Sequence, residues 1–170
     1  MSAGPSVLDR LLPKQFDNAY RGHVLALWLL VLALLLKLMI GVNSVGANPW
    51  LSPRTVAQTA DGIPLDAFGA SAADTVLMLF SICGLRLLLL VLIGAIALVR
   101  YRAMVPLVYL VLLADQLGRK VLVAVNPVER IGVPPADAIN WAFLAALSIG
   151  FLLSLASAPQ RAHADEMEQS

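Results

Sequence analysis

The sequence predicts an all-α polytopic membrane protein, folded as an antiparallel bundle of four transmembrane helices. Of its 170 residues, 59% are hydrophobic and only 14% are charged, whereas a soluble domain has about 45–50% apolar and about 25% charged residues. Four stretches are also long enough to cross a bilayer, which requires roughly 20 mainly apolar residues. These spans lie at about 24–42, 75–99, 103–125 and 138–157, within one domain that covers residues 1–170.

Composition also excludes several classes of protein. The net charge is only +1, so the basic surplus that nucleic-acid binding requires is missing. The high apolar content excludes intrinsic disorder. The single cysteine, Cys83, rules out an intramolecular disulfide and a dithiol redox enzyme, and we expect it to be a small core residue of the second span.

The first span follows a cytoplasmic lead-in at residues 1–22. We interpret it as a retained anchor, because its apolar run exceeds the 7–15 residues of a signal peptide and contains Lys37. Small or polar residues recur along one side of this helix and are expected to face the bundle interior. They are His23, Ala26, Ala33, Lys37, Gly41 and Ser44.

Residues 43–74 form the only long loop, on the outer side. Ser52 and Pro53 followed by Gly62 predict a short helix in this loop, with serine as its cap and proline at its first position. The loop is acidic and is placed to neutralise basic groups beneath it. By contrast, the link at residues 100–102 can only reverse the chain, so the second and third spans are antiparallel neighbours.

The distribution of positive residues predicts the orientation. Cytoplasmic segments of membrane proteins carry the excess of lysine and arginine. Six such residues flank the spans on one side and two lie in the loops on the other. Both termini, including a tail at residues 158–170, are therefore expected in the cytoplasm of a bacterial inner-membrane protein. The six are Arg10, Lys14, Arg21, Arg100, Arg102 and Arg161, and the two are Arg54 and Arg130.

Ionisable residues inside the spans are the strongest functional signal. A basic group near the bilayer centre costs roughly 2.5–3.5 kcal/mol to insert, so such residues mark a function or a partner by default. Counted at about 1.5 Å per residue, all of them lie at one level, from the midplane into the outer half. We therefore consider an outward-facing basic cavity that binds an anionic headgroup, with snorkelling towards the outer headgroups as the alternative. The residues that would line this cavity are Lys37, Arg86, Asp115, Gln116, Arg119 and Lys120.

Charge pairing within this group can be predicted in part. Asp115 and Arg119 have the spacing of an intrahelical ion pair, and Arg86 lies at a depth from which it can reach Asp115. One carboxylate cannot neutralise four cations, which leaves a surplus of up to three. Loop carboxylates such as Asp74 or Glu129, snorkelling, neutral lysines, a partner or a bound anion could meet it.

The fourth span contains no charge, and small residues recur at every fourth position. This spacing allows two helix backbones to approach closely. We expect the stripe to pack within the bundle or to dock another copy or another subunit. It comprises Ala138, Ala142, Ala146, Gly150 and Ser154.

No catalytic, metal or cofactor site is predicted. The two histidines, His23 and His163, lie outside the spans, so paired haem ligands are not available there. A serine nucleophile would have no histidine base at its depth. For an enzyme that acts on lipid, Asp115 is the only central candidate for acid or base chemistry.

Two segments, residues 11–23 (LLPKQFDNAYRGH) and 60–66 (ADGIPLD), resemble those of an uncharacterised group of small bacterial four-helix membrane proteins. The resemblance implies the same topology and a bacterial inner membrane, and it brings no activity with it.

The predicted function is that of a non-catalytic accessory or assembly subunit, and its expected partners are membrane lipid and either another membrane subunit or a second copy. A binder or carrier of an anionic amphiphile is the first alternative. A small membrane enzyme that acts on lipid is the second.

Overall fold

The computed structural model describes residues 11–12, 17–18, 20–127, 129–130, 132 and 135–156, and over these residues the chain is helical with no strand. The predicted tail at 158–170 and most of the lead-in lie outside this part. In order, the elements are α2 (Val24–Ser44), α3 (Pro53–Thr59), η1 (Leu65–Ala67), α4 (Ala70–Arg100), η2 (Arg102–Met104), α5 (Val105–Val125) and α6 (Pro135–Leu155).

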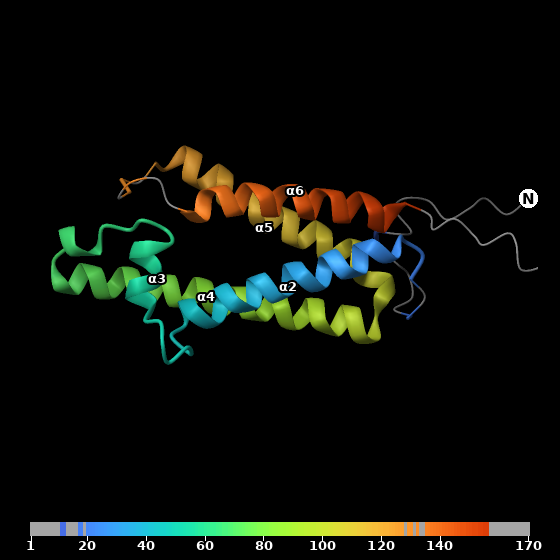
Figure 1. Cartoon of the computed structure of the whole chain (residues 1–170), viewed down its shortest axis with the longest axis horizontal. Helices are drawn as coiled ribbons and strands as arrows, with labels where there is room; N and C mark the ends of the chain where they lie inside the picture. Colours follow the sequence, from blue (N-terminus) through green and yellow to red (C-terminus); the bar gives the residue numbers. More distant parts are fainter. Residues whose placement is uncertain are drawn as a thin grey trace, which may run out of the picture.

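The four long helices lie side by side, and consecutive ones run in opposite directions (Figure 1). Helix α2 packs along α4 and α6, and α5 packs along α6. At one end, the amide of His23 donates to the carbonyl oxygen of Leu153 at 3.0 Å, which joins the start of α2 to the end of α6. The same end of the molecule contains the short η2 link between α4 and α5.

Three of these helices are long and apolar enough to cross a membrane, namely α2, α4 and the part of α6 from Ala136 to Leu155. Helix α5 has the same 21-residue length as α2. Because it also carries Asp115, Arg119 and Lys120, it is not among the three helices that are apolar enough to cross a membrane. The fold is therefore all-α and compatible with a membrane protein, as predicted.

Helix α4 begins at Ala70, earlier than the predicted boundary at residue 75, and is 31 residues long. At about 1.5 Å per residue it measures about 46 Å, well beyond the roughly 30 Å of bilayer hydrocarbon. The loop before it accounts for the extra turns. Ala57 of α3, Leu65 of η1 and Ala73 of α4 form a separate buried cluster. We call residues 52–68, which contain α3 and η1, the α3 cap. Ser52 accepts from the amide of Thr55 at 3.1 Å, as predicted for the helix cap.

Burial follows the stripe predicted for the first span except at His23, which precedes α2 and is exposed. Ala26, Ala33, Lys37, Gly41 and Ser44 are all buried on α2. Ala26 and Ala33 belong to a main core that also includes Leu30, Tyr109, Leu112 and Leu147. The hydroxyl of Tyr109 donates to the carbonyl oxygen of Ala26 at 2.6 Å and so ties α5 to α2.

Small residues set the close approach of α2 and α4. A Cβ atom added to Gly84 would lie 2.6 Å from Cβ of Ser44 and 3.2 Å from the carbonyl oxygen of Gly41. The buried residues of α4 form a narrow stripe that consists of Ala73, Gly84, Gly94 and Ala97. Cys83 lies beside this stripe and is exposed, so the expectation that it is a core residue is wrong.

The glycine contact gives a first test. Gly84→Ala is expected to destabilise the protein by about 1–3 kcal/mol, because the added methyl overpacks the α2–α4 contact. Gly118→Ala is the matched control, since a Cβ atom at Gly118 meets nothing within 4 Å, and it should stabilise the helix by roughly 0.5–1 kcal/mol. Unfolding in detergent micelles measures both changes. Equal stability of the two variants would contradict the close approach.

Candidate functional site

Helix α5 gathers the polar residues of the site on one side. Asp115 and Arg119 are four residues apart, as are Gln116 and Lys120, and residues at this spacing are neighbours on a helix surface. The opposite, apolar side is mostly open, since Leu110, Leu117 and Val121 are exposed. Helix α5 therefore directs its polar side towards the rest of the molecule.

Asp115 is the centre of the site. Its Oδ2 accepts from Nζ of Lys37 at 2.8 Å, and its Oδ1 lies 3.0 Å from Nη2 of Arg86. The Lys37 and Asp115 side chains are only 6% and 11% exposed. Nζ of Lys37 also lies 5.3 Å from the centroid of the Phe143 ring, within the range of a cation–π contact. One carboxylate on α5 thus connects α2 and α4, and Lys37 extends the contact to α6.

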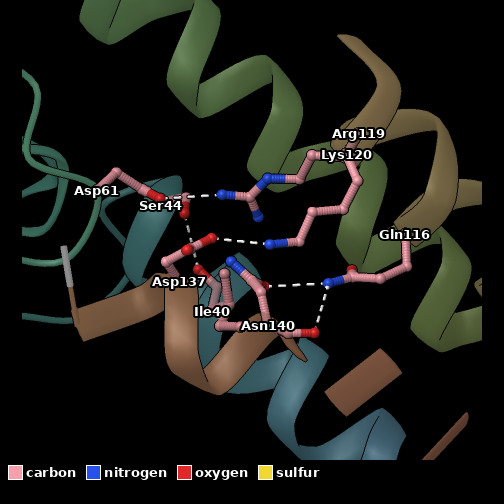
Figure 2. Close-up of polar contacts among 8 residues, drawn as sticks. All are labelled: Ile40, Ser44, Asp61, Gln116, Arg119, Lys120, Asp137 and Asn140. Atoms are coloured by element: carbon pink, nitrogen blue, oxygen red, sulfur yellow. Dashed lines mark hydrogen bonds and ion pairs between the residues drawn. The ribbon is translucent and has the colours of Figure 1, made fainter. Parts of the chain in front are cut away.

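Gln116 joins α5 to α6. Its side-chain amide donates to Oδ1 of Asn140 at 3.1 Å and to the carbonyl oxygen of Asn140 at 3.3 Å (Figure 2). Gln116 is only 2% exposed. Because a buried amide without partners would be costly, this contact fixes the register of the two helices.

The remaining two cations each have a carboxylate of their own. Nη2 of Arg119 lies 2.9 Å from Oδ1 of Asp61 in the α3 cap. Nζ of Lys120 lies 2.7 Å from Oδ1 of Asp137 on α6 and 4.2 Å from the centroid of the Trp141 ring. Figure 2 shows these side chains reaching away from α5 to their separate partners.

The predicted Asp115–Arg119 pair is therefore wrong. Both oxygens of Asp115 are engaged by cations from other helices, and Asp61 offers Arg119 a carboxylate of its own. The counter-charges come from Asp61 and Asp137 rather than from Asp74 or Glu129. Three carboxylates now face four cations, so the surplus falls from three positive charges to one.

The α3 cap is tied together by side-chain contacts to Asp66. Arg54 Nη2 and Gln58 Nε2 donate to the two oxygens of Asp66 at 2.7 and 2.8 Å. These hydrogen bonds lower the pKa of Asp66, and the one from Arg54 has the larger effect. The cap also contacts α6, where the amide of Ala136 donates to the carbonyl oxygen of Ala60 at 3.4 Å.

The predicted ligand-binding residues are thus brought into one region, where each of them contacts another residue of the chain. Lys37, Gln116 and Lys120 direct their polar atoms at internal partners. Arg119 is partly exposed and bound to the cap. Arg86 is also paired, with Asp115, but it is the most exposed of these side chains at 59%.

The predicted packing stripe of α6 divides into two halves. Gly150 and Ser154 are buried, and a Cβ atom at Gly150 would overlap the ring of Tyr109. Ala146 is half-buried, whereas Ala138 and Ala142 are exposed. Only the half that contains Ala138 and Ala142 is open to another chain.

Within the described part of the chain, no three histidine, cysteine, aspartate or glutamate residues gather as a metal site would require. His23 has a structural role, since its Nδ1 accepts from the amide of Leu25 at 3.1 Å and caps α2. Comparison with known proteins gives no match, whether to a family model, a curated protein or a solved structure.

The Asp115 contacts predict a large difference between two aspartates. Asp115→Asn should destabilise the protein by about 3–5 kcal/mol, because it leaves Lys37 buried without its counter-charge. Asp66→Asn removes a solvent-exposed pair and should change the stability far less, because water screens that pair. Unfolding in detergent micelles at pH 7 measures both. Equal effects would show that Asp115 has no special structural role.

The α3 cap should loosen in acid. The pKa of Asp66 is lower in the folded chain than in the unfolded one, so its stabilising effect is complete above about pH 4, the ordinary range of aspartate. It is lost as the pH falls through the lowered value. Hydrogen exchange of residues 53–67, corrected for the intrinsic rate, measures the loss between pH 6 and pH 2. Asp66→Asn should abolish this pH dependence, and an unchanged profile would contradict the role of Asp66.

Proposed function

We propose that the chain is a non-catalytic bacterial inner-membrane protein that serves as an accessory or assembly subunit and packs against a membrane partner. In this proposal α2, α4, α5 and α6 all span the bilayer. The pairing of Asp115, Arg119 and Lys120 supports α5 as the fourth span, because paired charges are tolerated in a bundle interior.

The topology has similar support. The start of α2 and the end of α6 lie together, joined by the contact between His23 and Leu153. The end of α4 and the start of α5 lie at the same end of the molecule (Figure 1). Helix α4 ends at Arg100, and the η2 link that follows it begins at Arg102. Because cytoplasmic loops are rich in arginine and lysine, this arrangement is what a protein with both termini in the cytoplasm would have.

The use of the polar groups is the observation that most favours a subunit over an enzyme or a carrier. Both oxygens of Asp115 bind cations, which leaves neither free to act as a base. Lys37, Gln116 and Lys120 are directed at protein atoms rather than at a ligand. These polar residues therefore connect the helices to one another. Contacts with other molecules would be made by the exposed faces of the helices.

Helix α4 offers the most open surface. In the apolar 18-residue stretch of α4, only 6% of the residues are buried, compared with 33% in the corresponding stretch of α2. Lipid covers such a surface in any membrane protein, but Arg86 is not a residue that lipid accommodates at low cost. One observation also favours the carrier alternative, namely that this exposed arginine belongs to a group with one surplus positive charge.

Native mass spectrometry in a mild detergent tests the proposal. The expected result is a complex of this chain with a different membrane protein, free of a stoichiometric anionic lipid. Ala142→Leu, on the exposed half of α6, reports whether that surface contributes. Gly150→Leu would not be informative, because it would displace Tyr109 within the chain.

A contrary result would be equally specific. A monomer that retains one anionic lipid, and loses it on Arg86→Ala, would establish the carrier alternative instead. Lys120→Ala serves as the matched control, since Lys120 has a carboxylate of its own and should not affect retention of that lipid.

A further inference from the structure

Among the four cations of this group, Arg86 is the one with the least complete partner in the described part of the chain. Lys37 and Arg86 share the single carboxylate of Asp115, whereas Arg119 and Lys120 each have their own. Lys37 is buried, so the surplus positive charge resides on the side of Arg86. A guanidinium group has five N–H donors, and 59% of the Arg86 side chain is exposed.

The depth of this charge limits what can neutralise it. Asp115 is the middle residue of the 21-residue helix α5, about 15 Å from either end at about 1.5 Å per residue. Arg86 is held 3.0 Å from Asp115 and therefore does not snorkel towards an end of the helix. Lipid phosphates lie outside the roughly 30 Å hydrocarbon layer, about 15 Å from this level. A carboxylate on another membrane helix can reach the same depth.

The surface around Arg86 suits a helix. Ile82 and Leu89 flank it on α4 and are 51% and 54% exposed. On α5, Val111 and Gly118 flank Asp115 and are also exposed. A Cβ atom at Gly118 would meet nothing within 4 Å, and such small residues permit close approach of helix backbones. We call Ile82, Arg86, Leu89, Val111 and Gly118 the Arg86 face.

We propose that the Arg86 face docks a transmembrane helix of a different protein, one that places an aspartate or glutamate beside Arg86 near the bilayer midplane. This inference rests on the proposed function and specifies the partner's chemistry. A second copy of this chain does not fit, because its long helices contain carboxylates only at Asp74, Asp115 and Asp137. Asp115 is already bound, and the other two lie near helix ends.

Photo-crosslinking of the full chain in its native membrane tests the inference. A p-benzoylphenylalanine at Ile82 is expected to crosslink a distinct protein whose membrane-spanning segment contains a carboxylate. Arg86→Gln should reduce the yield about tenfold, equivalent to about 1.4 kcal/mol of affinity. Arg86→Lys should retain most of it, and melting in detergent verifies that both variants fold.

A charge exchange provides the decisive step. Arg86→Glu should abolish the crosslink, and changing the partner's carboxylate to lysine should restore it. If Arg86→Glu does not fold, the comparison of Arg86→Gln with Arg86→Lys still decides. A yield that Arg86→Gln leaves unchanged would overturn the inference. So would a crosslink to lipid alone, to a second copy of this chain, or to no molecule.

Probes on other faces separate this inference from the proposed function. Leu32 on α2 and Ile139 on α6 are both exposed and suit the same photo-crosslinker. If Ile139 or Leu32 crosslinks a distinct protein while Ile82 does not, the Arg86 face is wrong and the subunit proposal stands. If none of the three positions crosslinks a protein, both proposals fail.

Discussion

The carboxylate of Asp115 forms ion pairs with side chains from two other helices, and the positions of these helices relative to one another depend on these pairs. Removing a charge from water is costly, and the cost is recovered only when the partner charge and hydrogen bonds are correctly placed. Lys37 reaches Asp115 from α2 and Arg86 reaches it from α4, so these helices cannot slide along α5 without separating charges. Gln116 imposes the same constraint on α6 through Asn140. Polar contacts thus fix the register, while Gly41 and Gly84 allow the close packing.

The same constraint explains why α5 differs from its neighbours. A helix that carries three charged residues can lie beside three apolar helices only if its polar side is covered, and in this chain the cover comes from distant segments. Asp61 reaches Arg119 from the α3 cap, and Asp137 reaches Lys120 from α6. The extra length of α4 supports this arrangement, since its first turns pack against the cap. The loop between α2 and α4 therefore supplies a counter-charge to α5 in addition to connecting the two helices.

Much of this could be predicted from helical periodicity. The buried stripe of α2, the polar side of α5, the Ser52 cap and the contact between Arg86 and Asp115 all follow from residue spacing and depth. The error concerned Arg119, because the i, i+4 rule considers only its own helix and such pairs contribute only about 0.2–0.5 kcal/mol. A carboxylate 58 residues away in sequence is its partner instead. The acidic composition of the loop signalled such a partner, but only the fold could select Asp61 over Asp74. The early start of α4 and the exposure of Cys83 likewise depend on tertiary packing.

The coupling energy between Lys37 and Asp115 tests the central role of this carboxylate most directly. A double-mutant cycle with Lys37→Met and Asp115→Asn, measured by unfolding in micelles, isolates their interaction from the effects of each single change. Two contacting groups in one network show coupling of about 0.5–3 kcal/mol, and we predict a favourable value near the upper end. The exposed pair of Arg54 and Asp66 should give a clearly smaller coupling in the same cycle, because water screens it. A Lys37–Asp115 coupling no larger than that of the exposed pair would contradict the role assigned to Asp115.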